Sequence, residues 1–262
     1  MSEISEPPAS LEVTGVSKSF NGITVLDSIA FRIAPGEIVG LIGQNGSGKS
    51  TLIKVLSGFH EPDEGATVLL GGRDATSLLR ERAASTGLGF IHQDLALVES
   101  MTILENLRIG QFRIGLAGRI RWKDEGLEVR RILALVGLDD VDPNLPISEL
   151  SVTERALVVI ARGLAELASG SALPARTLVL DEPTAYLPSS GVKRLFGVIR
   201  DLAAEGVSIL FVSHRLDEVL EHCHRAIVFR GGRLVADIET AGRTERHLVE
   251  LMLGEPPEDL YP

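Results

Sequence analysis

The segment "LIGQNGSGKST" carries the residues best suited to chemistry, because it contains Gly43, four further residues, and then Gly48, Lys49 and Ser50. Glycines let backbone N–H groups converge on phosphate oxygens, since a Cβ would forbid the required dihedral angles and the close approach. The lysine would bring a positive charge to the terminal phosphates, and the serine hydroxyl would reach Mg²⁺. The alternative is a glycine-rich turn without a ligand. The pattern favours a nucleotide-binding loop made by Gly43, Gln44, Asn45, Gly46, Ser47, Gly48, Lys49, Ser50 and Thr51.

A pair of carboxylates follows an apolar run in "TLVLDEP", at Asp181 and Glu182. Open α/β sheets bind ligands at the carboxyl ends of their strands, so we expect this pair to face the glycine-rich loop. Asp181 would hold Mg²⁺ through water, because this ion keeps much of its hydration shell. Glu182 would polarise an attacking water. Taken alone, the pair is better explained as an acidic helix start; together with the loop it predicts phosphate chemistry.

Short apolar runs that alternate with helical patterns must position these motifs. Strands are predicted at 11–20, 29–43, 65–72, 87–93, 176–182 and 207–214, and a hairpin is predicted around Gly231-Gly232. Helical spacing occurs at 49–58, 191–206 and 243–254, and over most of 95–165. Such alternation predicts an α/β fold with a buried parallel sheet. We expect a flexible tail over residues 1–10 and one domain over 11–262, with its core at 11–94 and 166–262 and a helical subdomain at about 95–165.

Five motifs in this order make the chain similar to the ATP-binding subunits of ABC transporters. "GQNGSGKST" and "LVLDEPTA" resemble the family's Walker A and Walker B motifs, and "FIHQD" resembles its Q-loop, with Gln93 in the glutamine position. "FVSHRLDEV" resembles the switch segment, with His214 as the histidine, and "ELSVTERALVVIAR" falls where the signature motif belongs. Phe20 stands where the family places an aromatic ring against adenine. The resemblance implies an ABC ATPase fold: a RecA-like P-loop NTPase core, an antiparallel β-subdomain and an inserted α-helical subdomain.

The resemblance also implies a mechanism and two cofactors, ATP and Mg²⁺. In this family two subunits enclose two ATP molecules, and each site combines one chain's P-loop with the other chain's signature helix, here beginning at Ser151. Gln93 and His214 would contact the γ-phosphate, and Glu182 would orient the attacking water. The implied magnesium ligands are Ser50, Gln93 and Asp181.

The segments "LIGQNGSGKSTLIKVLSG", "VSHRLDEVL" and "LMLGE" look like the branch that serves carbohydrate importers of the ribose, galactose or fructose type. That branch commonly fuses two ATP-binding units, whereas one unit is expected here, so the chain would pair with itself or with another ATP-binding subunit. The implied partners are a membrane permease and, indirectly, a substrate-binding protein. The implied location is the cytoplasm, on the inner face of the cell membrane through the permease.

The signature segment departs from the family pattern Leu-Ser-Gly-Gly-Gln. Ser151 is followed three residues later by Glu154, which is a capping box that would start a helix. The charge of Arg155 would offset that of Glu154 near the nucleotide. Pro188 stands where the family usually has an aspartate, so we expect altered communication between the two sites.

Composition excludes several classes of function. The formal net charge is −10, which disfavours nucleic acid as a partner, because backbone binding needs clustered Lys and Arg. The single cysteine excludes an internal disulfide framework. The triplet His222-Cys223-His224 lacks the gaps that zinc sites need. Two alternatives to a transport ATPase remain: a weakly hydrolysing regulatory subunit that pairs with a competent one, and a non-transport ABC ATPase, which the acidic charge disfavours.

Overall fold

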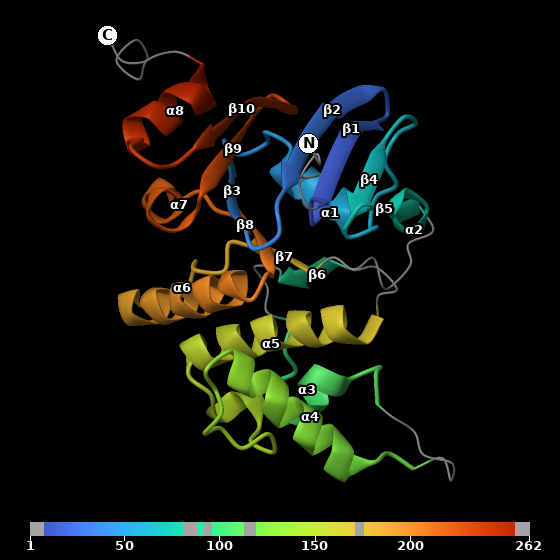
Figure 1. Ribbon diagram of the computed structural model, residues 1–262, viewed down its shortest axis with the longest axis vertical. Coiled ribbons are helices and arrows are strands. Elements are labelled where there is room, and N and C mark those ends of the chain that lie inside the picture. The colour runs from blue at the N-terminus through green and yellow to red at the C-terminus, as the bar shows by residue number, and fades with distance from the viewer. Residues whose placement is uncertain (1–7, 81–87, 92–95, 113–118, 171–175, 255–262) are drawn as a thin grey trace, which may run out of the picture.

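Two β-sheets form the centre of the computed structural model, which describes residues 8–80, 88–91, 96–112, 119–170 and 176–254 (Figure 1). The larger sheet has six strands in the order β10-β9-β3-β8-β7-β6, and all its neighbours are parallel except β9 and β10. Its strands are β3 (Ile38–Gly43), β6 (Leu88–Ile91), β7 (Thr177–Asp181), β8 (Ser208–Val212), β9 (Arg225–Arg230) and β10 (Arg233–Glu239). The predicted α/β class, parallel sheet and terminal hairpin are therefore confirmed.

The smaller sheet is antiparallel and has the order β2-β1-β4-β5. Its strands are β1 (Leu11–Phe20), β2 (Ile23–Ile33), β4 (Thr67–Leu70) and β5 (Arg73–Asp74). Asn21 and Gly22 join β1 to β2 with φ angles of 50° and 79°, as a two-residue hairpin turn with the twist of its strands requires. Ser10, which we expected in a flexible tail, is buried and donates its N–H to Ile33 O, so this sheet's bonding begins before Leu11. Residues 1–7 of that tail lie outside the described residues.

Some helices pack on the two faces of the six-stranded sheet, and others lie beyond them. They are α1 (Lys49–Leu56), α2 (Thr76–Arg80), α3 (Ile103–Arg108), α4 (Trp122–Leu135), α5 (Val152–Gly170), α6 (Ser189–Ala204), α7 (Leu216–His222) and α8 (Glu245–Leu253), with a 3₁₀ turn η1 (Ile147–Glu149) before α5. Figure 1 shows α5 lying between the sheet strand β6 and the pair α3 and α4, and contacts join α5 to all three. The predicted helical insert is thus attached to the sheet through α5.

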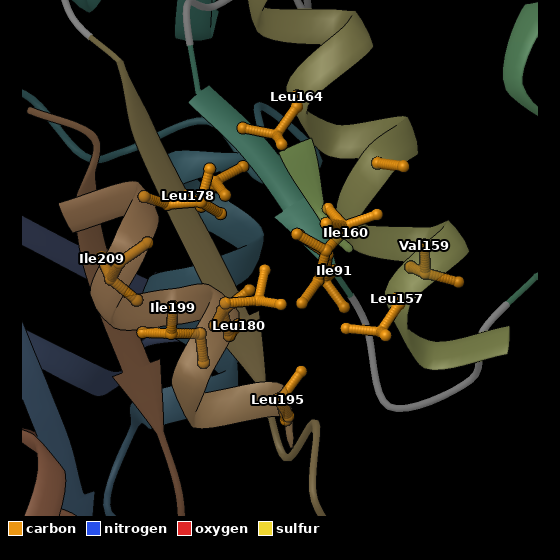
Figure 2. Close-up of a cluster of buried hydrophobic side chains, with 14 of the residues drawn as sticks. Ile91, Leu157, Val159, Ile160, Leu164, Leu178, Leu180, Leu195, Ile199 and Ile209 are labelled. Atoms are coloured by element: carbon orange, nitrogen blue, oxygen red, sulfur yellow. The ribbon is translucent and has the colours of Figure 1, made fainter. Parts of the chain in front are cut away.

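Alternation along the central strands divides the core into two clusters, one on each face of the six-stranded sheet. Leu178 and Leu180 of β7 belong to the cluster that contains α5 and α6, whereas Val179 belongs to the cluster that contains α1 and the small sheet. Figure 2 shows Leu178 and Leu180 packed between side chains of α5 and α6. Burial on both faces explains why these strands are almost continuously apolar. The polar residues discussed below lie at and just after the ends of β7 and β8.

Two sequence features have plain structural roles. His222 stacks on Phe196 with ring centroids 3.7 Å apart, while His224 Nδ1 accepts a hydrogen bond from Ile38 N at 2.9 Å. The two histidines of the His-Cys-His triplet therefore contact different neighbours, and over the described ranges no group of three or more metal-ligating side chains converges. Of the helices in the described part of the chain, none combines the length and the apolar character needed to cross a bilayer.

Candidate functional site

The glycine-rich loop lies between β3 and α1, as the sequence predicts. Gly43 ends β3 with φ 155°, and a Cβ there would lie 2.4 Å from Phe229 O. Gly48 occupies the N-cap of α1 with φ 108°, and its Cβ would lie 2.8 Å from a methyl group of Leu26. Only glycine satisfies both the dihedral angle and the space at these two positions. The loop therefore wraps tightly around the start of α1, whose N-terminal N–H groups favour an anion.

Lys49 is held on the inner side of this loop. Its Nζ donates to Gly43 O at 2.6 Å and to Gln44 O at 3.1 Å. Burial lowers the pKa of Lys49, while the nearby carboxylates of Glu182 and Asp181 act in the opposite direction. The ammonium group is thus fixed between backbone carbonyls and facing carboxylates, where it would meet the charge of a phosphate.

A pocket of about 300 Å³ opens at this loop and contains both predicted motifs. It is lined by Val25, Asn45, Gly46, Ser47, Gly48, Lys49, Ser50, Thr51, Asp181, Glu182 and Val212. Gly43 and Gln44 do not line the pocket, but their carbonyl oxygens accept the hydrogen bonds of Lys49 Nζ. Ser47 Oγ is buried against the backbone of Gly43 and has no hydrogen-bond partner among the described residues. The pocket therefore fits a phosphate group, with Ser50 and Asp181 supplying oxygen atoms of the kind that Mg²⁺ prefers.

The carboxylates enter this pocket from the carboxyl end of β7. Asp181 is the last residue of the strand, and Glu182 follows it with φ 53°, a left-handed conformation that costs a non-glycine residue about 1–3 kcal/mol. The strained backbone is fixed by Glu182 N, which donates to Val212 O of β8 at 2.9 Å. Glu182 is thereby turned out of the sheet plane toward the loop.

His214 meets Glu182 from the neighbouring strand end. Its Nδ1 lies 2.9 Å from Glu182 Oε2, although the two residues come from segments that follow β8 and β7 respectively. The carboxylate is largely buried, with 16% of its side chain exposed, whereas 69% of the imidazole is exposed. The imidazole can therefore contact a ligand directly, while the carboxylate faces a more restricted space. Gln93, the third predicted catalytic residue, lies outside the described residues.

The start of α5 has the predicted capping box. Ser151 N donates to Glu154 Oε2 at 2.8 Å, and Glu154 N donates back to Ser151 Oγ at 3.3 Å. The carboxylate also accepts a hydrogen bond from Ser151 Oγ at 2.7 Å, and this bond, followed by the one from Ser151 N, lowers the pKa of the Glu154 carboxyl. Ser151 is exposed and does not line the pocket of its own chain. The helix N-terminus is therefore presented to the surrounding solvent.

A family model described as ABC transporter matches residues 26–185, which is more than half of the chain and includes both the loop and the β7 carboxylates. The chain belongs to the ABC transporter family. This match agrees with the order of motifs seen in the sequence and with the pocket that unites them.

Curated relatives of this ABC transporter family member are named ribose import ATP-binding proteins. One from Burkholderia thailandensis is 38% identical over 255 residues, covering 96% of this chain and 48% of that protein. Others from Streptomyces avermitilis and Rubrobacter xylanophilus are 38% and 39% identical, covering 98% and 96% of this chain and 49% and 48% of theirs. The chain therefore spans about half the length of the curated relatives it matches.

Solved structures with the same fold are ATP-binding cassettes of ABC transporters. The ADP conformation of one cassette has a TM-score of 0.73 and 26% identity, covering 96% of this chain and 97% of its own. A nucleotide-free cassette has a TM-score of 0.71 and 27% identity, covering 95% of this chain and 96% of its own. The ABC ATPase fold predicted from the motifs is thus confirmed.

Phe20 lies outside the pocket lining of this ABC cassette. It ends β1 with 37% of its surface exposed, and its ring meets the edge of His60 at a centroid distance of 5.0 Å. Lys18 Nζ lies 5.3 Å from the centroid of the same ring. The ring is therefore accessible to a further partner, but the protein alone does not bring it into the phosphate pocket.

Arg155 and Pro188 each have a local structural role. Arg155 Nη1 bonds Glu99 Oε1 at 2.8 Å, and its other nitrogens donate to the carbonyl oxygens of Leu150 and Ser148. The arginine therefore ties the first turn of α5 to the preceding segments, and its ion pair is with Glu99 rather than with Glu154. Pro188 is the N-cap residue of α6, and its carbonyl accepts a hydrogen bond from Val192 N at 3.0 Å.

Several residues next to the site were not predicted from the sequence. Val25 lines the pocket from β2, and its apolar type in a strand gave no signal. Thr184 and Glu218 are both buried and are hydrogen bonded to each other at 2.8 Å. They follow Glu182 and His214 by two and four residues along the chain. A glutamate on a short helix is usually solvated, so only the three-dimensional arrangement identifies Glu218.

Proposed function

We propose that this chain binds ATP together with Mg²⁺ and hydrolyses the terminal phosphate bond. The observation that carries the proposal is the meeting of Lys49, Ser50, Asp181 and Glu182 around one pocket of about 300 Å³. A lysine, a hydroxyl and two carboxylates around a glycine-rich loop are the groups that nucleotide hydrolysis requires. Membership of the ABC transporter family supports the same conclusion.

Each residue then has a defined task. Lys49 would hold the terminal phosphates, and Ser50 and Asp181 would hold Mg²⁺, with Gln93 as a further ligand. When bound, the ion neutralises charge on the phosphate oxygens. Glu182 would orient and polarise the attacking water, because its carboxylate is largely buried at the pocket edge.

Three further contacts belong to this proposal. His214 would contact the γ-phosphate through its exposed imidazole while Nδ1 stays on Glu182. Phe20 would stack on adenine, since part of its ring is accessible. Ser151 at the exposed start of α5 would face the γ-phosphate in a second ATP-binding subunit, so that each active site is built from two subunits.

We also propose that hydrolysis energises a membrane importer for a sugar. The support is that relatives 38–39% identical are named ribose import ATP-binding proteins, of which this chain spans about half. The partners would be a permease, which holds the chain at the cytoplasmic face of the membrane, and indirectly a substrate-binding protein. The net charge of −10 supports a partner other than nucleic acid.

Uptake of radiolabelled ribose by cells that lack this chain tests the transport proposal. We expect uptake to fall when the gene is deleted and to return with the wild-type chain but not with Lys49→Ala. Ribose uptake that persists at the wild-type rate after deletion would contradict ribose import, and genes beside this one that encode a permease and a binding protein would then identify the cargo to test.

A further inference from the structure

A buried carboxylate, Glu218, joins the two segments that carry Glu182 and His214. Only 3% of Glu218 and 1% of Thr184 are exposed, and Thr184 Oγ1 donates to Glu218 Oε2 at 2.8 Å. Thr184 lies two residues after Glu182, and Glu218 lies four residues after His214 on α7. The hydrogen bond therefore links the loop after β7 to the helix after β8.

The other side of Glu218 is held by the residue next to His214. Arg215 Nη1 lies 2.7 Å from Glu218 Oε1, as an ion pair rather than a well-aligned hydrogen bond. Arg215 N also donates to Ser213 Oγ at 3.0 Å. The two neighbours of His214 along the chain, Ser213 and Arg215, are thus hydrogen bonded to each other. Arg215 in turn joins this segment to the buried carboxylate of Glu218.

The placement of Glu218 is electrostatically costly. Burial raises the pKa of its carboxyl, and the nearby carboxylates of Asp217 and Glu182 act in the same direction, against Thr184 and Arg215. An apolar residue would fill this position without that penalty. A purely packing role therefore leaves the carboxylate unexplained, whereas a hydrogen-bonded tether between two strand ends explains it.

We propose that Thr184 and Glu218 are positioning residues, which hold Glu182 and His214 at hydrogen-bonding distance and so set the rate of turnover. The inference rests on the proposed function of the site. Neither residue lines the pocket. Glu182 has a strained backbone with φ 53°, so its orientation depends on contacts made by the residues that follow it. Loss of the tether would let Glu182 and His214 separate without removing any group that contacts the nucleotide.

Steady-state ATP hydrolysis and equilibrium ATP binding by Thr184→Val and Glu218→Gln test this inference. The first variant keeps the shape of the side chain but removes the hydroxyl, and the second removes the charge that pairs with Arg215. We expect kcat to fall about 10- to 100-fold in each, as for a misplacement of about 1 Å, with the KM for ATP within about 3-fold of wild type. Thr184→Ser, which keeps the hydroxyl, should retain most of kcat.

Two controls separate the possible outcomes. Glu221→Gln lies on the same helix with its side chain 77% exposed, and it should behave as wild type. The second control, Glu182→Gln, is measured in parallel and tests the proposed function. If the wild type hydrolyses ATP no faster than this variant, both the proposed function and the positioning role are refuted. If the wild type turns over ATP but Thr184→Val and Glu218→Gln keep its kcat, or if Thr184→Ser falls as far as Thr184→Val, the positioning role is refuted while the proposed function stands.

Discussion

The surroundings of Lys49 determine both the pKa and the orientation of its ammonium group. Burial lowers the pKa of its ammonium group, and the carboxylates of Asp181 and Glu182 counteract that effect. Two backbone carbonyls of the loop accept its hydrogen bonds, so the group is oriented before a ligand arrives. A preoriented charge contributes more to binding than a mobile one, because less side-chain freedom is lost on binding.

We expect Lys49→Ala to weaken ATP binding about 10- to 100-fold, because a hydrogen bond to a charged group contributes about 1.5–3 kcal/mol. Isothermal titration with ATP and Mg²⁺ measures the affinity. The matched control is Lys54→Ala, five residues further along the chain and exposed on the same helix, which should bind ATP as wild type does. Equal affinities for wild type and Lys49→Ala would show that the loop does not hold phosphate.

Two helices of this chain, α3 and α5, begin with a capping box of the same kind. Ser151 and Glu154 form one at the start of α5, and Thr102 and Glu105 form the other at α3. Each satisfies N–H groups that the first turn of a helix leaves unpaired. The two capping boxes can therefore be compared directly, because they make the same kinds of hydrogen bonds and differ in their position in the molecule.

We expect Ser151→Ala and Thr102→Ala each to lower the free energy of unfolding by about 1 kcal/mol, the usual cost of losing an N-cap. Thermal unfolding measures this loss. Under the proposed function only Ser151→Ala should also lower ATP hydrolysis, because its helix start would face the γ-phosphate of a second subunit. If both variants hydrolyse ATP at the wild-type rate, the start of α5 is only a cap.

The capping box of α5 also predicts a dependence of stability on pH. Hydrogen bonds from Ser151 lower the pKa of Glu154 in the folded chain. The carboxylate therefore stabilises the fold above the pKa of an unfolded glutamate, about 4.3, and this contribution is lost as the pH falls through the lower folded pKa. The difference in melting temperature between wild type and Glu154→Gln should be largest near pH 7 and shrink toward pH 3. A difference that grows as the pH falls would contradict this assignment.

At the scale of the whole molecule, the elements near the site were predictable because their signals are local. The strand ending at Asp181 is a short apolar run, and its burial on both faces follows from that composition. The loop could be recognised from Gly43 to Ser50, since the dihedral angles there require glycine. The Gly231-Gly232 pair likewise predicted the hairpin of β9 and β10.

What the sequence could not predict are contacts between segments that are distant along the chain. Nothing in the spacing places Thr184 against Glu218, 34 residues later. The contact between Arg155 and Glu99 is of the same kind, because the two residues are 56 positions apart. Hydrogen bonds of this kind depend on how helices pack on the sheet, and that packing is decided by the whole core.

Under the proposed function, ATP turnover depends on the loop, the end of β7 and the end of β8 together, and the Glu182→Gln variant tests this dependence. We expect the variant to bind ATP within about 3-fold of wild type but to hydrolyse it at least about 100-fold more slowly, since only the group that would polarise water is lost. Phosphate release and equilibrium ATP binding, measured on the same preparations with Mg²⁺, give both quantities. A wild-type chain that binds ATP yet releases phosphate no faster than Glu182→Gln would contradict the proposed hydrolysis and identify a weakly hydrolysing regulatory subunit instead.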